Sequence, residues 1–151
     1  MERVTTRDRT PVQLFATLVG ATFLLVGIAG FIPGITSHLY GGLDFAGHNS
    51  DAQILHIFQT SWLHNIVHLA FGIAGLMLAR TWEGARAFLI GGGVIYLVLW
   101  LYGLIVGQDS SANFVPLNTA DDWLHFLLGV GMIGLGFATT RDRRMAERPA
   151  T

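Results

Sequence analysis

One stretch decides how the chain folds: Trp62-Leu63-His64-Asn65-Ile66-Val67-His68-Leu69-Ala70-Phe71-Gly72. It is an apolar segment that carries three polar side chains on adjoining faces, because residues three and four apart lie on one side of a helix. A polar group that faces hydrocarbon costs several kcal/mol. We therefore expect this helix to turn its polar face toward protein, at the centre of a small membrane bundle.

The composition indicates that lipid surrounds most of the chain. Hydrophobic residues make up 52% of the 151 residues and charged residues 13%, against about 25% charged residues in a typical soluble domain. The net charge of -1 argues against nucleic-acid binding, which requires a clustered basic face. Since the sequence contains no cysteine, neither disulfides nor thiolate metal sites can form.

Four long uncharged runs predict four membrane-spanning helices, because each is close to or above the roughly 20 residues that a span requires. We expect an all-α integral membrane four-helix bundle between an N-terminal tail and a C-terminal tail. The predicted segments are 1–10 (tail), 11–32, 60–80, 86–107 and 121–140 (spans within a domain of residues 11–140), and 141–151 (tail).

Two helix starts are expected in the loops between these spans. Ser50 is the expected N-cap of a helix that begins at Asp51 and continues into the second span. Asn118 or Thr119 is the expected N-cap of the fourth span.

The positions of the arginines predict the orientation of the bundle. All nine basic residues are arginines, and with four spans every one of them falls on the side that holds both termini. The two loops on the other side carry only acidic charges. Because Lys and Arg accumulate in cytoplasmic segments, we expect both termini in the cytoplasm and a multi-pass location in the inner (cytoplasmic) membrane.

The opening of the central stretch recurs near the start of the fourth span. Trp62-Leu63-His64 and Trp123-Leu124-His125 are identical, and each histidine lies sixteen residues before an arginine at the end of its span, Arg80 or Arg141. With the constant rise of a helix, the two histidines are predicted at equal depth. The repeat indicates two tandem helical hairpins.

The buried polar side chains admit three interpretations. In the first, they form a structural hydrogen-bond network that fixes helix register, as polar residues do in membrane bundles. Asn65 would then pair with His68, and Asp121 or Asp122 with His125.

In the second interpretation the same region binds a cofactor, and in the third it forms part of a path for protons or a small solute. His64 or His68 together with His125 could supply the two axial ligands of a haem b. Alternatively, these three histidines and Asp121 could bind a divalent metal ion. The sequence itself names no cofactor.

The short chain and its glycine-rich helix faces favour a non-catalytic protein. We expect an accessory or structural subunit of a membrane complex, or a self-associating bundle, with the lipid bilayer, other subunits or further copies as partners. Without cysteine and without a serine in a nucleophile motif, an enzyme is the less favoured reading. A redox protein with haem or metal and a proton or solute transporter are the alternatives.

Two motifs resemble those of a known family. The first is His64-Asn65-x-x-His68-Leu69, and the second is Pro116-x-Asn118-x-Ala120-Asp121-x-Trp123-Leu124-His125. Together they are similar to the signatures of a bacterial family, common in actinobacteria, of four-span membrane proteins with a domain of unknown function. The resemblance implies the topology and implies no activity.

Overall fold

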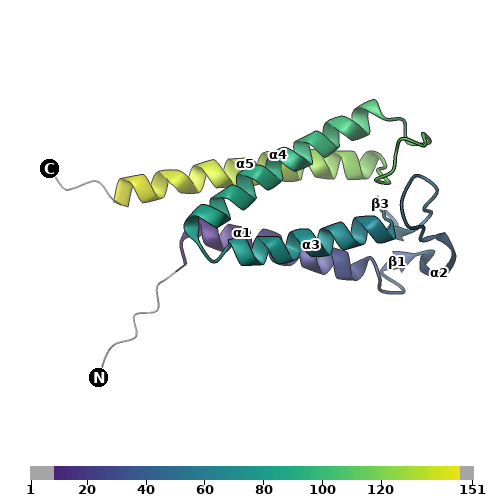
Figure 1. Cartoon of the computed structure of the whole chain (residues 1–151), viewed down its shortest axis with the longest axis horizontal. Coiled ribbons are helices and arrows are strands. Elements are labelled where there is room, and N and C mark those ends of the chain that lie inside the picture. The colour runs from purple at the N-terminus through teal and green to yellow at the C-terminus, as the bar shows by residue number, and fades with distance from the viewer. Residues whose placement is uncertain (1–8, 147–151) are drawn as a thin grey trace, which may run out of the picture.

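The computed structural model describes residues 9–146, which form mainly helices, with a small sheet and the longer loops at one end (Figure 1). In chain order the elements are α1 (Pro11–Ala29), β1 (Thr36–Ser37), α2 (Leu39–Gly42), β2 (Gln53–Ile54), β3 (Phe58–Gln59), α3 (Trp62–Leu78), α4 (Trp82–Ile105) and α5 (Thr119–Ala146).

The four longer helices form two antiparallel hairpins. Helix α1 packs mainly against α3, and α4 packs mainly against α5, whereas contacts between the two pairs are few. Figure 1 shows that α3 and α5 both run from the end that holds the loops toward the opposite end. This pairing and direction agree with the two tandem hairpins predicted from the repeated Trp-Leu-His motif.

The described helices suit a lipid environment. Three of them are long and apolar enough to cross a membrane: α1, α4, and α5 over Thr119–Thr139. Helix α3 is apolar but has 17 residues, slightly fewer than the roughly 20 of a typical span. Large apolar side chains face outward, with Leu25 66% and Leu127 65% exposed, as expected for helices that contact acyl chains.

Glycines let the two helices of each hairpin touch backbone to backbone. A Cβ atom at Gly27 of α1 would lie 2.8 Å from the backbone nitrogen of Leu69, and one at Gly72 of α3 would lie 2.6 Å from a backbone nitrogen of α1. In the second hairpin, a Cβ at Gly93 would lie 2.8 Å from the carbonyl oxygen of Gly129. Such close approach is a common way for helices to associate in lipid.

Side-chain caps fix where three of the helices begin. The Ser61 hydroxyl accepts a hydrogen bond from the backbone N–H of His64 (3.1 Å), and the Thr81 hydroxyl accepts one from Gly84 (3.1 Å). The side-chain oxygen of Asn118 accepts the backbone N–H of Asp121 (3.0 Å), which confirms Asn118 as a predicted cap of α5.

The helix predicted to begin at Asp51 is wrong. Strands β2 and β3 occupy this region and pair in a three-stranded antiparallel sheet with β1. Ser50 caps no helix, because its hydroxyl donates to the carbonyl oxygen of Thr60 (2.5 Å) and so holds the loop closed. The turn between the strands contains Leu55 and His56 in left-handed conformations, which a helix excludes.

The other helix ends differ from the predicted spans by a few residues. Helix α1 ends at Ala29 rather than at 32, α4 begins at Trp82 rather than at 86, and α5 continues to Ala146 rather than ending at 140. The predicted tails fall partly on residues 1–8 and 147–151, which lie outside the described residues.

Candidate functional site

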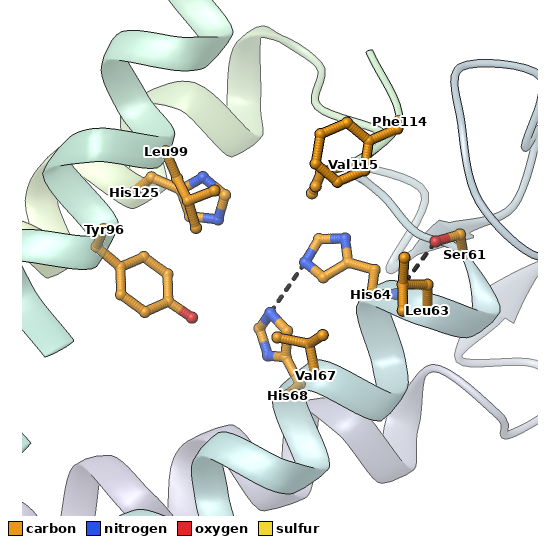
Figure 2. Close-up of a pocket in the computed structure, with 10 residues that line it drawn as sticks. All are labelled: Ser61, Leu63, His64, Val67, His68, Tyr96, Leu99, Phe114, Val115 and His125. Carbon is orange, nitrogen blue, oxygen red and sulfur yellow. Dashed lines mark hydrogen bonds between the residues drawn. The ribbon is translucent and has the colours of Figure 1, made fainter. Parts of the chain in front are cut away.

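A cavity of about 140 Å³ lies between the two hairpins, in the half of the bundle nearer the loops (Figure 2). Five side chains with polar groups line it: Ser61, which caps α3, His64 and His68 from α3, Tyr96 from α4, and His125 from α5. Both hairpins therefore contribute polar side chains to the cavity. The three histidines singled out in the sequence are brought together here, and Tyr96 joins them.

The sequence of α3 explains why its histidines face inward. Asn65, His68, Gly72 and Gly75 are all buried and recur at spacings of three and four residues, so they form one face of the helix. His64 is half-buried beside this face. The prediction that the polar face of this stretch turns toward protein is consistent with this burial.

His64 and His68 are paired with each other. Their Nε2 atoms lie 2.9 Å apart, so that one nitrogen donates a hydrogen and the other accepts it (Figure 2). With both rings neutral, the accepting ring carries its own hydrogen on Nδ1. Both Nδ1 atoms are buried and have no hydrogen-bond partner within the described part of the chain. A buried donor without a partner costs about 1–3 kcal/mol.

His125 and Tyr96 form the opposite wall. Their rings meet edge to face with centroids 5.0 Å apart, and only 3% of His125 and 5% of Tyr96 is exposed. The Nδ1 atom of His125 has no hydrogen-bond partner among residues 9–146. Figure 2 shows the Tyr96 hydroxyl directed into the space between its ring and His68. Buried tyrosines usually hydrogen-bond their hydroxyl, so this wall presents unused bonding capacity.

A cluster of aromatic rings packs against two of the side chains that line the cavity, Tyr96 and His68. Phe23 stacks on Tyr96, with centroids 5.2 Å apart and planes 8° from parallel, and meets the ring of His68 edge-on at 5.6 Å. Phe71 meets both Phe23 and Tyr96 edge to face, at 5.5 and 5.9 Å. Because these rings belong to or pack against the core, Tyr96 and His68 are supported by well-packed side chains.

The two hydrogen bonds predicted for the structural network are replaced by others. Asn65 donates to the carbonyl oxygen of Gly30 (3.0 Å) and accepts from the Thr60 hydroxyl (2.6 Å), so it fixes the end of α1 rather than His68. Asp122 is 6% exposed, and its Oδ1 atom has no partner within the described residues.

Asp121 joins the two hairpins instead of orienting His125. Its Oδ2 atom accepts the backbone N–H of Gln59 (3.0 Å) and that of Asn118 (3.0 Å). The amide of Asn118 in turn donates to the carbonyl oxygen of Ile57 (2.8 Å). These bonds link the start of α5 to strand β3 and the turn that precedes it, and Asp121 does not line the cavity.

The cavity constrains which cofactors the histidines can hold. Its volume is close to that of an engineered protein cavity of about 150 Å³ that binds benzene, so a haem macrocycle does not fit between the hairpins as they stand. Among residues 9–146, no group of three or more His, Cys, Asp or Glu side chains is positioned to hold a metal ion. A metal ion would therefore depend on the His64–His68 pair, with His125 drawn closer.

Sequence reasoning missed Tyr96 and the loop after α4 as parts of the site. Tyr96 could have been found, because a hydroxyl in the middle of a long apolar run requires a partner. Phe114 and Val115, which also line the cavity, gave no signal, since nothing in an isolated loop indicates where it folds back.

Comparison with known proteins gives a family without an activity. The family model described as Domain of unknown function (DUF4383) matches residues 13–138, which include both hairpins and the loops between them. No curated protein and no solved structure matches the chain.

Proposed function

Because the chain belongs to the family defined by Domain of unknown function (DUF4383), which carries no activity, we propose a function from the chain's own geometry. It is a small non-catalytic membrane protein that binds a small ligand between its two hairpins, and it serves as an accessory or structural subunit. The resemblance of its motifs further favours an actinobacterial source.

One observation carries the ligand-binding part of this proposal. Three side chains that line the cavity are each more than nine-tenths buried: His68, Tyr96 and His125. They do not form hydrogen bonds with one another in the described part of the chain. A pocket with mostly apolar walls and a few convergent polar groups is the usual form of a small-molecule site. A ligand with matching polar atoms would offset the cost of leaving the Tyr96 hydroxyl and the Nδ1 atoms of His68 and His125 without partners.

The proposed topology has four spans with both termini in the cytoplasm, in the inner membrane. Helix α3 completes the set because it pairs along its length with α1, and a short span is accommodated by local thinning of the bilayer. The arginine distribution supports the orientation. Reporter fusions after the helix ends test it. A reporter enzyme that is active only outside the cytoplasm should be active when it is fused in the loop after α4.

The outward-facing glycines support the subunit role. Gly91 on α4 and Gly131 and Gly134 on α5 are exposed, and a Cβ atom at any of them would meet nothing within 4 Å. Small residues on a lipid-facing surface allow another helix to approach closely. They provide a surface for a partner subunit or for a second copy.

A divalent metal ion is the second candidate ligand, and the His64–His68 pair favours it. Two nitrogens bound to one tetrahedral zinc ion lie about 3.4 Å apart, given Zn–N distances of about 2.0–2.1 Å. The observed Nε2 separation of 2.9 Å is a few tenths of an ångström shorter. Elemental analysis of purified protein tests this candidate, and bound metal should disappear from a His64→Ala variant.

Gentle purification followed by native mass spectrometry tests the proposal as a whole. We expect a bound small molecule, a co-purifying subunit, or both. The small molecule should be lost when His68 and His125 are both replaced by Leu. It should be retained when His56, which is exposed in the β2–β3 turn, is replaced by Asn. A strictly monomeric and ligand-free species would contradict the proposal.

A further inference from the structure

We infer that the cavity receives the oxygen-bearing ring of a lipid-soluble molecule of the quinone or quinol class, whose apolar tail stays in the bilayer. This inference rests on the proposed ligand-binding function and names the chemical class of the ligand. Three features of the cavity carry it: its size, its polar wall and its position at the lipid-facing surface.

The size and the apolar walls select a single ring. A volume of about 140 Å³ is close to that of an apolar cavity known to accept benzene. Leu63, Val67 and Leu99 supply aliphatic walls, and Phe114 covers the side of the loops. An ion that kept part of its hydration shell would find few polar atoms here, and the cost of transferring it from water would be large.

The polar groups select a ring that carries oxygen. The Tyr96 hydroxyl reaches into the cavity and makes no hydrogen bond with any other residue in the described part of the chain. It can donate to a carbonyl oxygen or accept from a hydroxyl group. The neutral imidazole of His125, on the same wall, has one donating and one accepting nitrogen. This wall therefore matches both the quinone and the quinol form.

The position of the cavity selects a ligand that arrives through the membrane. Val67, which lines the cavity, is also 49% exposed on the apolar surface of α3. The wall between α3 and α4 is thus thin, because these helices belong to different hairpins and contact each other little. A tail attached to the ring would leave through this wall into acyl chains.

Aromatic packing supports two of the lining rings, Tyr96 and His68, against which a flat ligand ring could lie. Phe23 and Tyr96 stack nearly in parallel there, and His68 meets Phe23 edge-on. A planar ligand can add to such a set of rings by offset or edge-to-face packing.

Two matched probes test the inference on the purified full chain in delipidated detergent micelles. One is decyl-trimethyl-1,4-benzoquinone, whose fully substituted ring does not react with nucleophiles. The other is decyl-trimethylbenzene, which has the same ring and tail without the oxygens. We expect the quinone to raise the midpoint of thermal unfolding with a saturable dependence on concentration, and the benzene analogue to raise it much less.

Three variants locate the binding site. Tyr96→Phe should weaken the apparent Kd for the quinone about tenfold, the equivalent of one hydrogen bond, and leave the response to the benzene analogue unchanged. Val67→Trp, which fills the outer wall, should abolish the response to both probes. His56→Asn should respond like the wild-type protein. The pair Tyr96→Phe and Val67→Trp keeps the test informative if either variant folds poorly.

Other outcomes would overturn the inference in distinguishable ways. Equal responses to both probes, unchanged by Tyr96→Phe, would show that the oxygens are not recognised. If Zn²⁺ stabilises the protein, His64→Ala abolishes this effect and neither probe has any effect, the ligand is a metal ion and not a quinone. The quinone inference would then be wrong, and the proposed ligand-binding function would stand. No response to probes or metal, together with a ligand-free mass spectrum, would remove both.

Discussion

The interfaces inside the two hairpins and the seam between the hairpins are built by different means. Inside each hairpin, glycines bring backbone against backbone and leave no room for a Cβ atom. The seam, by which we mean the rings of Phe23, His64, His68, Tyr96 and His125 between the hairpins, is filled by side chains and contains a cavity. The comparison teaches that the closest backbone packing lies within the pairs and that free volume lies between them.

The largest effect should come from disturbing a backbone contact inside a hairpin. Gly27→Ala should lower the free energy of unfolding by about 3 kcal/mol, because the new Cβ would lie 2.8 Å from the backbone nitrogen of Leu69 and 2.9 Å from the carbonyl oxygen of Asn65. Thermal unfolding in detergent, followed by circular dichroism, measures it. The control is Gly131→Ala, which meets nothing within 4 Å; a loss as large as that of Gly27→Ala would break the comparison.

A slightly smaller effect is expected from the polar side chain that secures the first hairpin. Asn65→Ala should cost about 2 kcal/mol, since the carbonyl oxygen of Gly30 and the hydroxyl of Thr60 would lose their partner while buried. The same unfolding assay measures the loss. Wild-type stability in this variant would mean that these bonds form no part of the interface.

A buried carboxylate of the second hairpin, that of Asp122, should contribute less to stability than the amide of Asn65. Asp122→Asn should retain stability or raise it by about 1 kcal/mol, because Oδ1 has no partner in the described residues and a neutral amide is less costly to bury than a carboxylate. The amide has nearly the same shape beside Gly103, whose backbone it contacts closely. A marked loss of stability in the unfolding assay would reveal a role for the charge.

The smallest effect is expected in the seam. Tyr96→Phe should change the unfolding free energy of ligand-free protein by no more than about 0.5 kcal/mol, although the residue is only 5% exposed. The reason is that its hydroxyl faces the cavity rather than a protein partner. Calorimetry or thermal unfolding of delipidated protein checks this. A loss comparable to that of Asn65→Ala would show that the seam is as tightly specified as the hairpins.

The sequence predicts the general architecture because the signals for it are local. The lengths of the apolar runs mark the helices, and the repeated Trp-Leu-His motif indicates which helices run in the same direction. The inward position of His68 and His125 follows from the cost of exposing them to lipid. Each of these inferences depends on a short contiguous stretch of sequence and not on how the loops fold.

The hydrogen-bond partners could not be predicted, because they are backbone groups brought together by folding. Asn65 binds the carbonyl oxygen of Gly30, and Asp121 binds the backbone N–H of Gln59, 62 positions earlier in the sequence. Helical spacing pointed to histidines instead, since it compares only side chains on neighbouring turns. The small sheet was missed for a related reason: its strands have two residues each, too few to show alternation.

The carboxylate of Asp121 accepts hydrogen bonds from the backbone N–H groups of both Gln59 and Asn118. It therefore links the two hairpins at the end of the molecule that holds the loops. A link placed there resists separation of the hairpins at the loop end, so that any widening of the space between them would have to occur along the helices. Entry into the cavity would then depend on the lipid around the helices more than on solutes beside the loops.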